Sequence, residues 1–404
     1  MANVNFSPEQ MTLLHLIGHN LFAMPFSPDP DTDWREVYKE SRAQTVGLLA
    51  FQNYRELPMD EDIAADINKF IKASTWRNIQ CFQYHTYLHK LLTQHDIPYC
   101  VVKGAASASY YPDSLLRAMG DVDFYVHPDD IHRAIAVFEA EGFERDRVNH
   151  PCHIAMKNGK KHFEMHFKPV AFHNGPVGKK LEEYWQDIRQ TAVPSEMEFA
   201  TYIGPSIFHH GFILLTHLQH HLFYEGVGLR HFCDWAVFTN TFSDEEFVAV
   251  FKTELKRIGL FRLAQLLSLG AVKYMGMPYK EWMGNDYETA DELLEDIIYG
   301  GNFGRKDQQR SYEGMFIADR DTGDMSKGRL IQIFSSLNDI VDSRWRVAKK
   351  CPLLYPIGWA YFSLRYLIRV LLGKRKMNLL DTYQKSGHRR EKYAKFRVFE
   401  PEEL

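Results

Sequence analysis

The stretch of sequence that decides the fold is IPYCVVKGAASASYYPDSLLRAMGDVDFYV, residues 97–126. Its first part, residues 97–102, is an apolar and β-branched run that predicts a buried strand. Lys103 and Gly104 end this strand, and the small residues after them allow a tight turn and a helix start that approaches a ligand closely. A second strand is predicted over residues 122–126. The stretch therefore predicts two strands joined by a compact connection.

Two carboxylates, Asp121 and Asp123, lie at the start of the second strand. Residues two apart in a strand point to the same face of the sheet, so these side chains project side by side. Adjacent carboxylates repel each other, and a divalent cation relieves that repulsion. Mg²⁺ prefers such oxygen ligands and leaves room for the phosphates of a substrate. The pair therefore predicts a metal site that faces a phosphorylated ligand.

The order of these motifs resembles that of a known superfamily. A strand, Lys-Gly, small residues, Tyr-Pro, an arginine and then Gly-Asp-Val-Asp resembles the nucleotidyltransferases of the polymerase-β-like fold, and residues 103–126 are similar to its branch of uncharacterised bacterial nucleotidyltransferases. The resemblance implies an α+β fold: a polymerase-β-like core, made of a small mixed sheet with flanking helices, embedded in a largely helical chain. The sequence departs from the commonest form because Gly104 is followed by Ala105, and the first serine is Ser107.

A third carboxylate follows on a predicted hairpin. The Asn-Gly pair at residues 158–159 is a strong hairpin signal, and residues 161–167 alternate between polar and apolar side chains. Glu164 lies on the polar face of this strand, with His162 and His166 beside it. The resemblance implies that an acidic residue in such a strand completes the metal site. The alternative is an exposed strand face that carries polar residues without a function.

The resemblance also implies an activity, the transfer of a nucleoside monophosphate from an NTP substrate to a hydroxylated acceptor with release of pyrophosphate. Asp121, Asp123 and Glu164 would be the catalytic residues and would hold two Mg²⁺ or Mn²⁺ ions. A second hypothesis is a catalytically degenerate nucleotidyltransferase fold that serves as a binding or assembly module. The change at Ala105 favours the second hypothesis, and the three carboxylates favour the first.

A further set of residues is expected to bind the nucleotide. Backbone N–H groups at the turn after the first strand, together with a nearby hydroxyl, suit triphosphate oxygens because a helix N-terminus favours anions. Basic side chains would neutralise phosphate charge. The related branch has a similar helix followed by a Gly-x-Leu-Arg-His…Asp segment, which implies that His217 of the helix, with Arg230 and Asp234 of the segment, lies near the cleft. The residues expected to bind the nucleotide are Lys103, Gly104, Ser107, Arg117, His217 and Arg230.

The same helical region offers a third hypothesis, a metal phosphohydrolase. His217 and His221 lie four residues apart on one face of a predicted helix, a spacing that can ligate a metal. With Asp234 they resemble helical phosphohydrolases, which bind metals through His and Asp, although the sequence has no His-Asp doublet here. The alternatives are a contact with the nucleotide and, more simply, histidines that are hydrogen-bonded within a partly buried helix.

The composition is that of an ordinary globular protein, with 45% hydrophobic and 25% charged residues among 404. The five cysteines lie far apart without a Cys-x-x-Cys pair, which predicts a reducing compartment rather than disulfides or a zinc–cysteine site. The first ten residues lack the charged and apolar regions of a signal peptide, so a cytoplasmic location is expected.

The chain divides into a helical part (1–90), a catalytic core (91–200), a helical domain lining the cleft (201–300) and a loop with a basic helical part (301–404).

Local patterns add predictions for single elements. A capping box starts a helix at Ser7-Pro8-Glu9-Gln10, and helical periodicity covers residues 38–51, 62–93, 206–224 and 229–239. Residues 300–328 are rich in Gly and polar residues and are predicted to form a loop.

Charge is distributed unevenly. Residues 344–397 contain 15 Lys and Arg against two acidic residues, a local charge of +13, which leaves −17 for the rest because the total is −4. A basic segment suits a polyanion, either nucleic acid (although no base-stacking motif supports it) or a membrane surface; alternatively it docks on the acidic body of the protein. An apolar stretch ending near residue 372 is too short to span a membrane, and packing on the helical domain is preferred to peripheral membrane contact.

Overall fold

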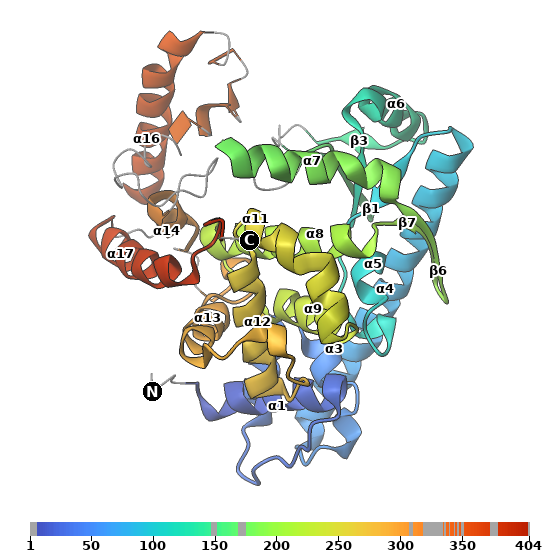
Figure 1. The fold of residues 1–404 in the computed structure, drawn as a ribbon, viewed down its shortest axis with the longest axis vertical. Coiled ribbons are helices and arrows are strands. Elements are labelled where there is room, and N and C mark those ends of the chain that lie inside the picture. The colour runs from blue at the N-terminus through green and yellow to red at the C-terminus, as the bar shows by residue number, and fades with distance from the viewer. Residues whose placement is uncertain are drawn as a thin grey trace.

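The computed structural model describes residues 6–146, 152–168, 175–306, 310–317, 334, 337–338, 340–342, 344–345, 347–348, 351–371 and 379–402. Helices predominate, and a five-stranded mixed sheet and a two-stranded sheet lie at one side of them (Figure 1). This is the α+β architecture that the resemblance predicted, a small mixed sheet set in a largely helical chain.

The N-terminal part is helical, as predicted. It contains α1 (Pro8–Phe22), α2 (Trp34–Ala43), α3 (Gly47–Ala50) and α4 (Glu61–Gln94). The predicted capping box is present, because Ser7 and Gln10 each accept a hydrogen bond from the other's backbone N–H. The long helix predicted over residues 62–93 is confirmed as α4. The single helix predicted over residues 38–51 is wrong, since α2 ends at Ala43 and the chain turns at Thr45, whose φ is 59°.

The five-stranded sheet has the strand order β1-β2-β5-β4-β3. Its strands are β1 (Tyr99–Val101), β2 (Val122–Val126), β3 (Glu144–Arg145), β4 (His153–Asn158) and β5 (Lys161–His166). Neighbouring strands are antiparallel except β2 and β5, which are parallel. The predicted hairpin is confirmed as β4–β5, with Gly159 in the turn at φ +56°. In the β2–β5 pair Asp123 lies opposite Glu164, so the register sets two predicted catalytic carboxylates side by side.

The two faces of β2 contact different cores. Val122, Phe124 and Val126 pack with α4 and with α6 (Ile131–Ala140) in a core that belongs to the sheet. The opposite face carries Asp123 and Tyr125, and the tyrosine packs into the core of the helical body, against α7 (Gly175–Thr191). Because side chains alternate along a strand, the carboxylates of β2 face the helical body rather than the core of the sheet.

The helical body follows the sheet in the chain. A hairpin of β6 (Val193–Met197) and β7 (Ala200–Gly204) precedes it, so the prediction of helix from residue 201 is wrong for the first four residues. The next two predicted helices are confirmed as α8 (Ile207–Tyr224) and α9 (Leu229–Asn240). The body continues through α10 (Asp244–Phe247), α11 (Thr253–Arg257), α12 (Phe261–Met275) and α13 (Tyr287–Gly300).

The C-terminal part packs on the helical body through α14 (Arg310–Ile317) and α17 (Leu379–Phe396). The loop predicted over residues 300–328 is therefore wrong for residues 310–317, whereas residues 318–328 lie outside the described part of the chain. Basic residues of α17 pair with acidic residues of α13 and α14, among them Lys392 with Glu295 and Arg389 with Glu313. For α17, the structure therefore agrees with the alternative that the basic segment docks on the acidic body of the protein.

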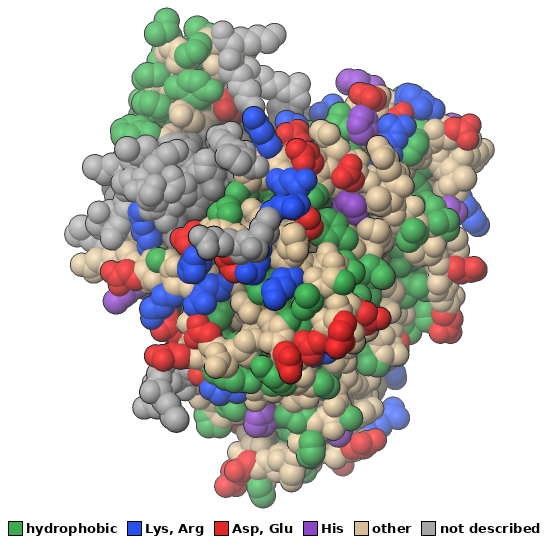
Figure 2. Space-filling view, viewed as in Figure 1, with side chains coloured by type: hydrophobic (Ala, Val, Ile, Leu, Met, Phe, Trp, Pro, Cys, Tyr) green, Lys and Arg blue, Asp and Glu red, His purple; other side chains and the backbone are tan. Residues whose placement is uncertain are grey.

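The helix α16 (Tyr355–Leu371) extends away from the body (Figure 1). Hydrophobic side chains gather over it (Figure 2), and the most exposed apolar residues in and next to this helix are Leu353, Ile357, Tyr361, Leu364, Leu367 and Ile368. The prediction that this segment packs on the helical domain is not met for these side chains. Among the described residues there is no helix with the length and apolar character needed to cross a membrane.

Candidate active site

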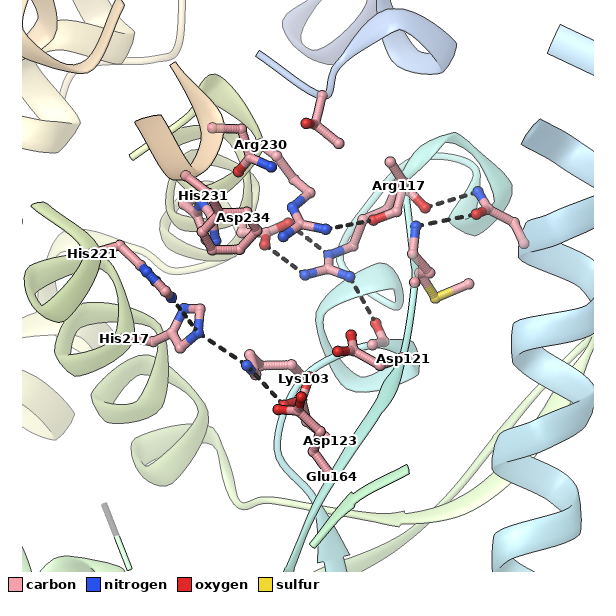
Figure 3. Close-up of a pocket in the computed structure, with 18 of the residues that line it drawn as sticks. Lys103, Arg117, Asp121, Asp123, Glu164, His217, His221, Arg230, His231 and Asp234 are labelled. Atoms are coloured by element: carbon pink, nitrogen blue, oxygen red, sulfur yellow. Dashed lines mark hydrogen bonds and ion pairs between the residues drawn. The ribbon is translucent and has the colours of Figure 1, made fainter. Parts of the chain in front are cut away.

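A cavity of ≈ 700 Å³ is lined by residues of the five-stranded sheet, of α8 and α9 and of the N-terminal helices. The cavity joins residues that the sequence analysis singled out separately (Figure 3). The predicted site residues that line it are Lys103, Gly104, Arg117, Asp121, Asp123, Glu164, His217 and Arg230. Ser107, the remaining predicted residue, is not part of this lining; it is buried in α5 (Ala105–Ala108), with its hydroxyl unpartnered among the described residues.

Of the three predicted carboxylates, Asp121 directly precedes β2, Asp123 lies within β2 and Glu164 lies within β5. Asp123 is buried, and its Oδ1 lies 3.0 Å from Nζ of Lys103 and 2.9 Å from Nε2 of His166. Asp121 is more open, with 41% of its side chain exposed. The carboxylate oxygens of Glu164 lie 3.7 to 4.0 Å from three histidine rings of β4 and β5. The carboxylates are thus surrounded by imidazoles and by one ammonium group.

Burial and neighbouring charges separate the pKa values of the two carboxylates that face each other. Burial alone would raise the pKa of Asp123, but the Lys103 ammonium and His166 outweigh it and hold that pKa well below its usual range. Burial raises the pKa of Glu164 to about 8, and the negative charges of Asp123 and Asp121 contribute to the increase. Without a metal ion, the protein therefore keeps Asp123 ionised but does not place enough positive charge near Glu164 to keep it ionised at neutral pH.

The residues around Glu164 fit a divalent cation. Asp121, His162 and Glu164 offer ligand atoms within 4.8 Å of one another, and His153, Glu164 and His166 do the same. Carboxylate oxygens suit Mg²⁺ and Mn²⁺, while imidazole nitrogens extend the choice to later transition metals. The buried Nε2 of His162 has no hydrogen-bond partner among the described residues. A cation here would satisfy this nitrogen and ionise Glu164.

The turn after β1 is built differently from a phosphate-binding turn. Gly104 has φ +60°, and a Cβ at this position would lie 2.4 Å from Nε2 of His85, so the turn requires glycine. The same nitrogen, 3.2 Å away, accepts the N–H of Ala105 at the start of α5. Burial lowers the pKa of His85 to about 4, so its ring is neutral and can accept this bond. The first amide of α5 therefore bonds to the protein itself.

Arg117 and Asp234 form a buried ion pair across the cavity wall. The Nε and Nη2 atoms of Arg117 each donate to one oxygen of Asp234 at 2.8 Å, and the Tyr111 hydroxyl donates to the same carboxylate at 2.7 Å. The Nη1 atom of Arg117 lies 3.5 Å from the carbonyl oxygen of Gly104. The structure thus places Arg117 against Asp234 rather than free for a phosphate. Because Asp234 pairs with Arg117, it does not act as a metal ligand together with His217 and His221.

Basic residues that were not predicted from the sequence reach the cavity from elsewhere in the chain. Arg42 at the end of α2, Arg77 in α4 and Arg305 near residues 302–304 line the cavity together with Arg230. Arg230 donates to the carbonyl of Ala118 at 3.3 Å, while its buried Nε has no partner among the described residues. Single arginines in predicted helices or loops carry no signal of this role, because only the fold brings them together.

His231 is a further residue that was not predicted from the sequence, although it follows Arg230 in a segment already singled out. It lies on α9 beside His217 and His221 of α8, and one ring nitrogen of each residue is within 4.8 Å of the others (Figure 3). The Lys103 ammonium is 2.9 Å from Nε2 of His217, so one side chain contacts both this histidine cluster and Asp123.

Comparison with known proteins agrees with the motif-based resemblance. The sequence profile of a family described as uncharacterised nucleotidyltransferase matches residues 30–276, which is more than half of the chain. The chain therefore belongs to this family. The matched span includes the strands that carry the three carboxylates and the helices that carry the histidines. No curated protein matches the chain.

Proposed function

We propose that this member of a nucleotidyltransferase family transfers a nucleoside monophosphate from an NTP to a hydroxyl group of an acceptor, with release of pyrophosphate, in a reaction that requires Mg²⁺ or Mn²⁺. The observation that carries the proposal is the parallel pairing of β2 with β5. It sets Asp123 opposite Glu164, next to Asp121, in the wall of a cavity that also contains basic side chains.

The residues of the cavity have distinct proposed roles. Bound at Asp121, Asp123 and Glu164, two divalent cations would neutralise triphosphate charge and lower the pKa of the acceptor hydroxyl. Lys103 keeps Asp123 ionised and hence ready to act as a ligand. Glu164 has a pKa of about 8 without metal, and the cations would ionise it so that it completes the metal site. Positioning and electrostatic stabilisation would supply most of the rate acceleration.

The phosphate chain would lie toward the arginines. Arg230, Arg42, Arg77 and Arg305 line the cavity, and guanidinium groups form paired hydrogen bonds with phosphate oxygens. Arg117 is not assigned this role because its donors are directed at Asp234. The acceptor is a hydroxylated molecule: a protein side chain, a nucleic acid end, a sugar phosphate or a small metabolite.

The test is isothermal titration of the four NTPs with and without Mg²⁺, using wild type, Asp121→Asn and a matched control. Asp129→Asn is a suitable control because this aspartate is 82% exposed in its side chain and lies in the short turn after β2, outside the cavity. We expect magnesium-dependent binding of at least one NTP to wild type and to Asp129→Asn, and its loss in Asp121→Asn.

Two results would overturn the proposal. A folded wild type that binds no NTP in the presence of Mg²⁺ or Mn²⁺ would favour the degenerate binding module. Binding that is unchanged in Asp121→Asn would remove the metal site from the mechanism. Once a donor NTP is known, release of pyrophosphate in the presence of candidate acceptors identifies the acceptor class.

A further inference from the structure

The histidine cluster of the cavity has the composition of a transition-metal site. His217 and His221 lie one turn apart on α8, and His231 faces them from α9. All three residues are buried, with relative exposures of 8%, 9% and 6%. Three imidazoles without a carboxylate among the converging atoms form a donor set different from that around Glu164.

Hydrogen bonds fix the tautomers of two of these rings. A neutral imidazole has one N–H and one nitrogen with a free lone pair. The Glu225 carboxylate accepts only, so Nδ1 of His221, 3.1 Å from Oε2, carries the proton and Nε2 carries the lone pair. The Lys103 ammonium donates only, so Nε2 of His217, 2.9 Å from Nζ, also presents its lone pair.

These two lone pairs face each other. The Nε2 atoms of His217 and His221 are 3.0 Å apart, and neither has a hydrogen to place between them in the neutral state. Burial lowers the pKa of both rings, and the nearby Lys103 ammonium lowers that of His217 further, which keeps the rings neutral. The Lys103 ammonium compensates the lone pair of His217 in the structure, and a metal ion between the nitrogens would compensate both lone pairs.

His231 supplies independent evidence for a ligand. Neither ring nitrogen of His231 has a hydrogen-bond partner among the described residues, although the ring is buried. A buried polar group without a partner costs free energy, and its presence in a folded protein calls for an ion or a water. The ring of Phe303 packs against His221 and His231 at centroid distances of 4.8 and 5.8 Å, which shields the cluster on one side.

We propose that His217, His221 and His231 bind a divalent transition-metal ion, with Zn²⁺ as the best match, at a site separate from the carboxylates. Tetrahedral zinc with Zn–N bonds of about 2.0–2.1 Å places its ligand nitrogens about 3.3 Å apart, close to the 3.0 Å seen between His217 and His221. Glu225 orients His221 from behind, as carboxylates do for zinc-bound histidines. Three protein ligands leave a fourth position for water or a substrate oxygen.

Metal binding to this cluster requires a rearrangement of Lys103. Its ammonium occupies the lone pair of His217, and it also contacts Asp123 at 3.0 Å. On metal binding Lys103 would give up the contact with the histidine and keep the one with the carboxylate. Mg²⁺ prefers oxygen ligands, so the histidine cluster would not compete for the Mg²⁺ proposed at the carboxylates.

The experiment uses the full chain without an affinity tag, stripped of metal with a chelator and titrated with Co²⁺ as a visible probe for the zinc site. Four-coordinate Co²⁺ absorbs strongly in the visible range, whereas Co²⁺ in an oxygen-rich site does not. The variants are His231→Ala, His231→Gln in case the alanine variant does not fold, Asp121→Asn and His388→Ala. His388 is a control for surface histidines, because 90% of its side chain is exposed.

We expect one strongly absorbing Co²⁺ per wild-type chain, displaced by Zn²⁺, whatever weakly absorbing Co²⁺ binds at the carboxylates. The His231 variants should bind at least about tenfold more weakly, while Asp121→Asn and His388→Ala should keep the wild-type spectrum and affinity. Wild-type binding in a folded His231 variant would overturn the proposal, and so would loss of the spectrum in Asp121→Asn. These outcomes are independent of NTP binding, so nucleotidyl transfer and the histidine site can fail separately.

Discussion

The substitution Asp234→Ala tests whether Arg117 is a structural residue or a phosphate ligand. In the structure Asp234 accepts two parallel hydrogen bonds from Arg117 at 2.8 Å and one from Tyr111 at 2.7 Å. Coulombic interaction with Arg117 lowers the pKa of Asp234 against the opposing effect of burial, so the carboxylate is ionised. Its removal leaves a guanidinium group without its counter-charge inside the protein.

The expected loss of stability follows from the burial of this pair. The side chains of Arg117 and Asp234 are only 5% and 2% exposed, so solvent cannot replace the lost partner. Removing one member of such a pair costs about 3–5 kcal/mol of the free energy of unfolding. Arg230 adds to this cost, because burial and the positive charge of Arg117 lower its pKa and Asp234 is the opposing negative charge.

The assay is urea unfolding followed by circular dichroism, for wild type, Asp234→Ala and the control Asp121→Asn. Asp121 is 41% exposed in its side chain, so its substitution should change stability by less than about 0.5 kcal/mol. The double variant Arg117→Met/Asp234→Leu should recover most of the loss, because it removes both buried charges. A loss below about 1 kcal/mol in Asp234→Ala would refute the structural role, as would an Arg117→Met variant that is fully stable but no longer binds NTP.

Three further predictions concern single residues. The pKa of Glu164 is raised from an ordinary 4.5 to about 8, so between these pH values the folded chain retains a proton that the unfolded chain releases. Without metal, the free energy of unfolding should therefore fall as pH rises from 4.5 to about 8. Urea titrations should show a smaller fall for Glu164→Gln. Arg77→Ala should weaken binding of inorganic triphosphate about tenfold in calorimetry, whereas Lys69→Ala, on the same helix with 79% of its side chain exposed, should not. Gly104→Ala should lower the free energy of unfolding by about 1–3 kcal/mol, because Gly104 has φ +60° and a Cβ there would lie 2.4 Å from a histidine ring. The control Gly120→Ala should be neutral, because a Cβ at Gly120 would have nothing within 4 Å. Equal losses in thermal or urea unfolding would contradict this prediction.

The sequence predicted the part of the site that depends on local pattern. Alternation within β2 and β5 placed the carboxylates on one face of each strand, and the Asn-Gly turn at residues 158–159 fixed the hairpin. The register that sets Asp123 opposite Glu164 is a tertiary result, whereas the resemblance implied only that an acidic residue in this strand completes the metal site. Both carboxylates could therefore be selected without coordinates.

The remaining features depend on distances between segments that no local pattern encodes. Whether Arg117 binds a phosphate or a carboxylate is decided by Asp234, more than a hundred residues later in the chain. Arg42 and Arg77 look like ordinary helix surface residues until the folded chain turns them toward the cavity. His231 follows Arg230 directly in the sequence, yet its proximity to His217 and His221 depends on how α8 packs on α9.

The charge arrangement of the cavity gives the strongest physical reason to look for a metal–triphosphate complex in it. Asp121 and Glu164 lie near imidazoles at one end, and the raised pKa of Glu164 shows that negative charge there is not fully compensated. Arg230 and Arg77 line the same cavity, and Arg230 carries a buried Nε without a partner among the described residues. An anion alone would be repelled by the carboxylates, and a cation alone would leave the arginines unsatisfied. A triphosphate that carries divalent cations compensates both ends together, so nucleotide and metal should each bind more tightly in the presence of the other.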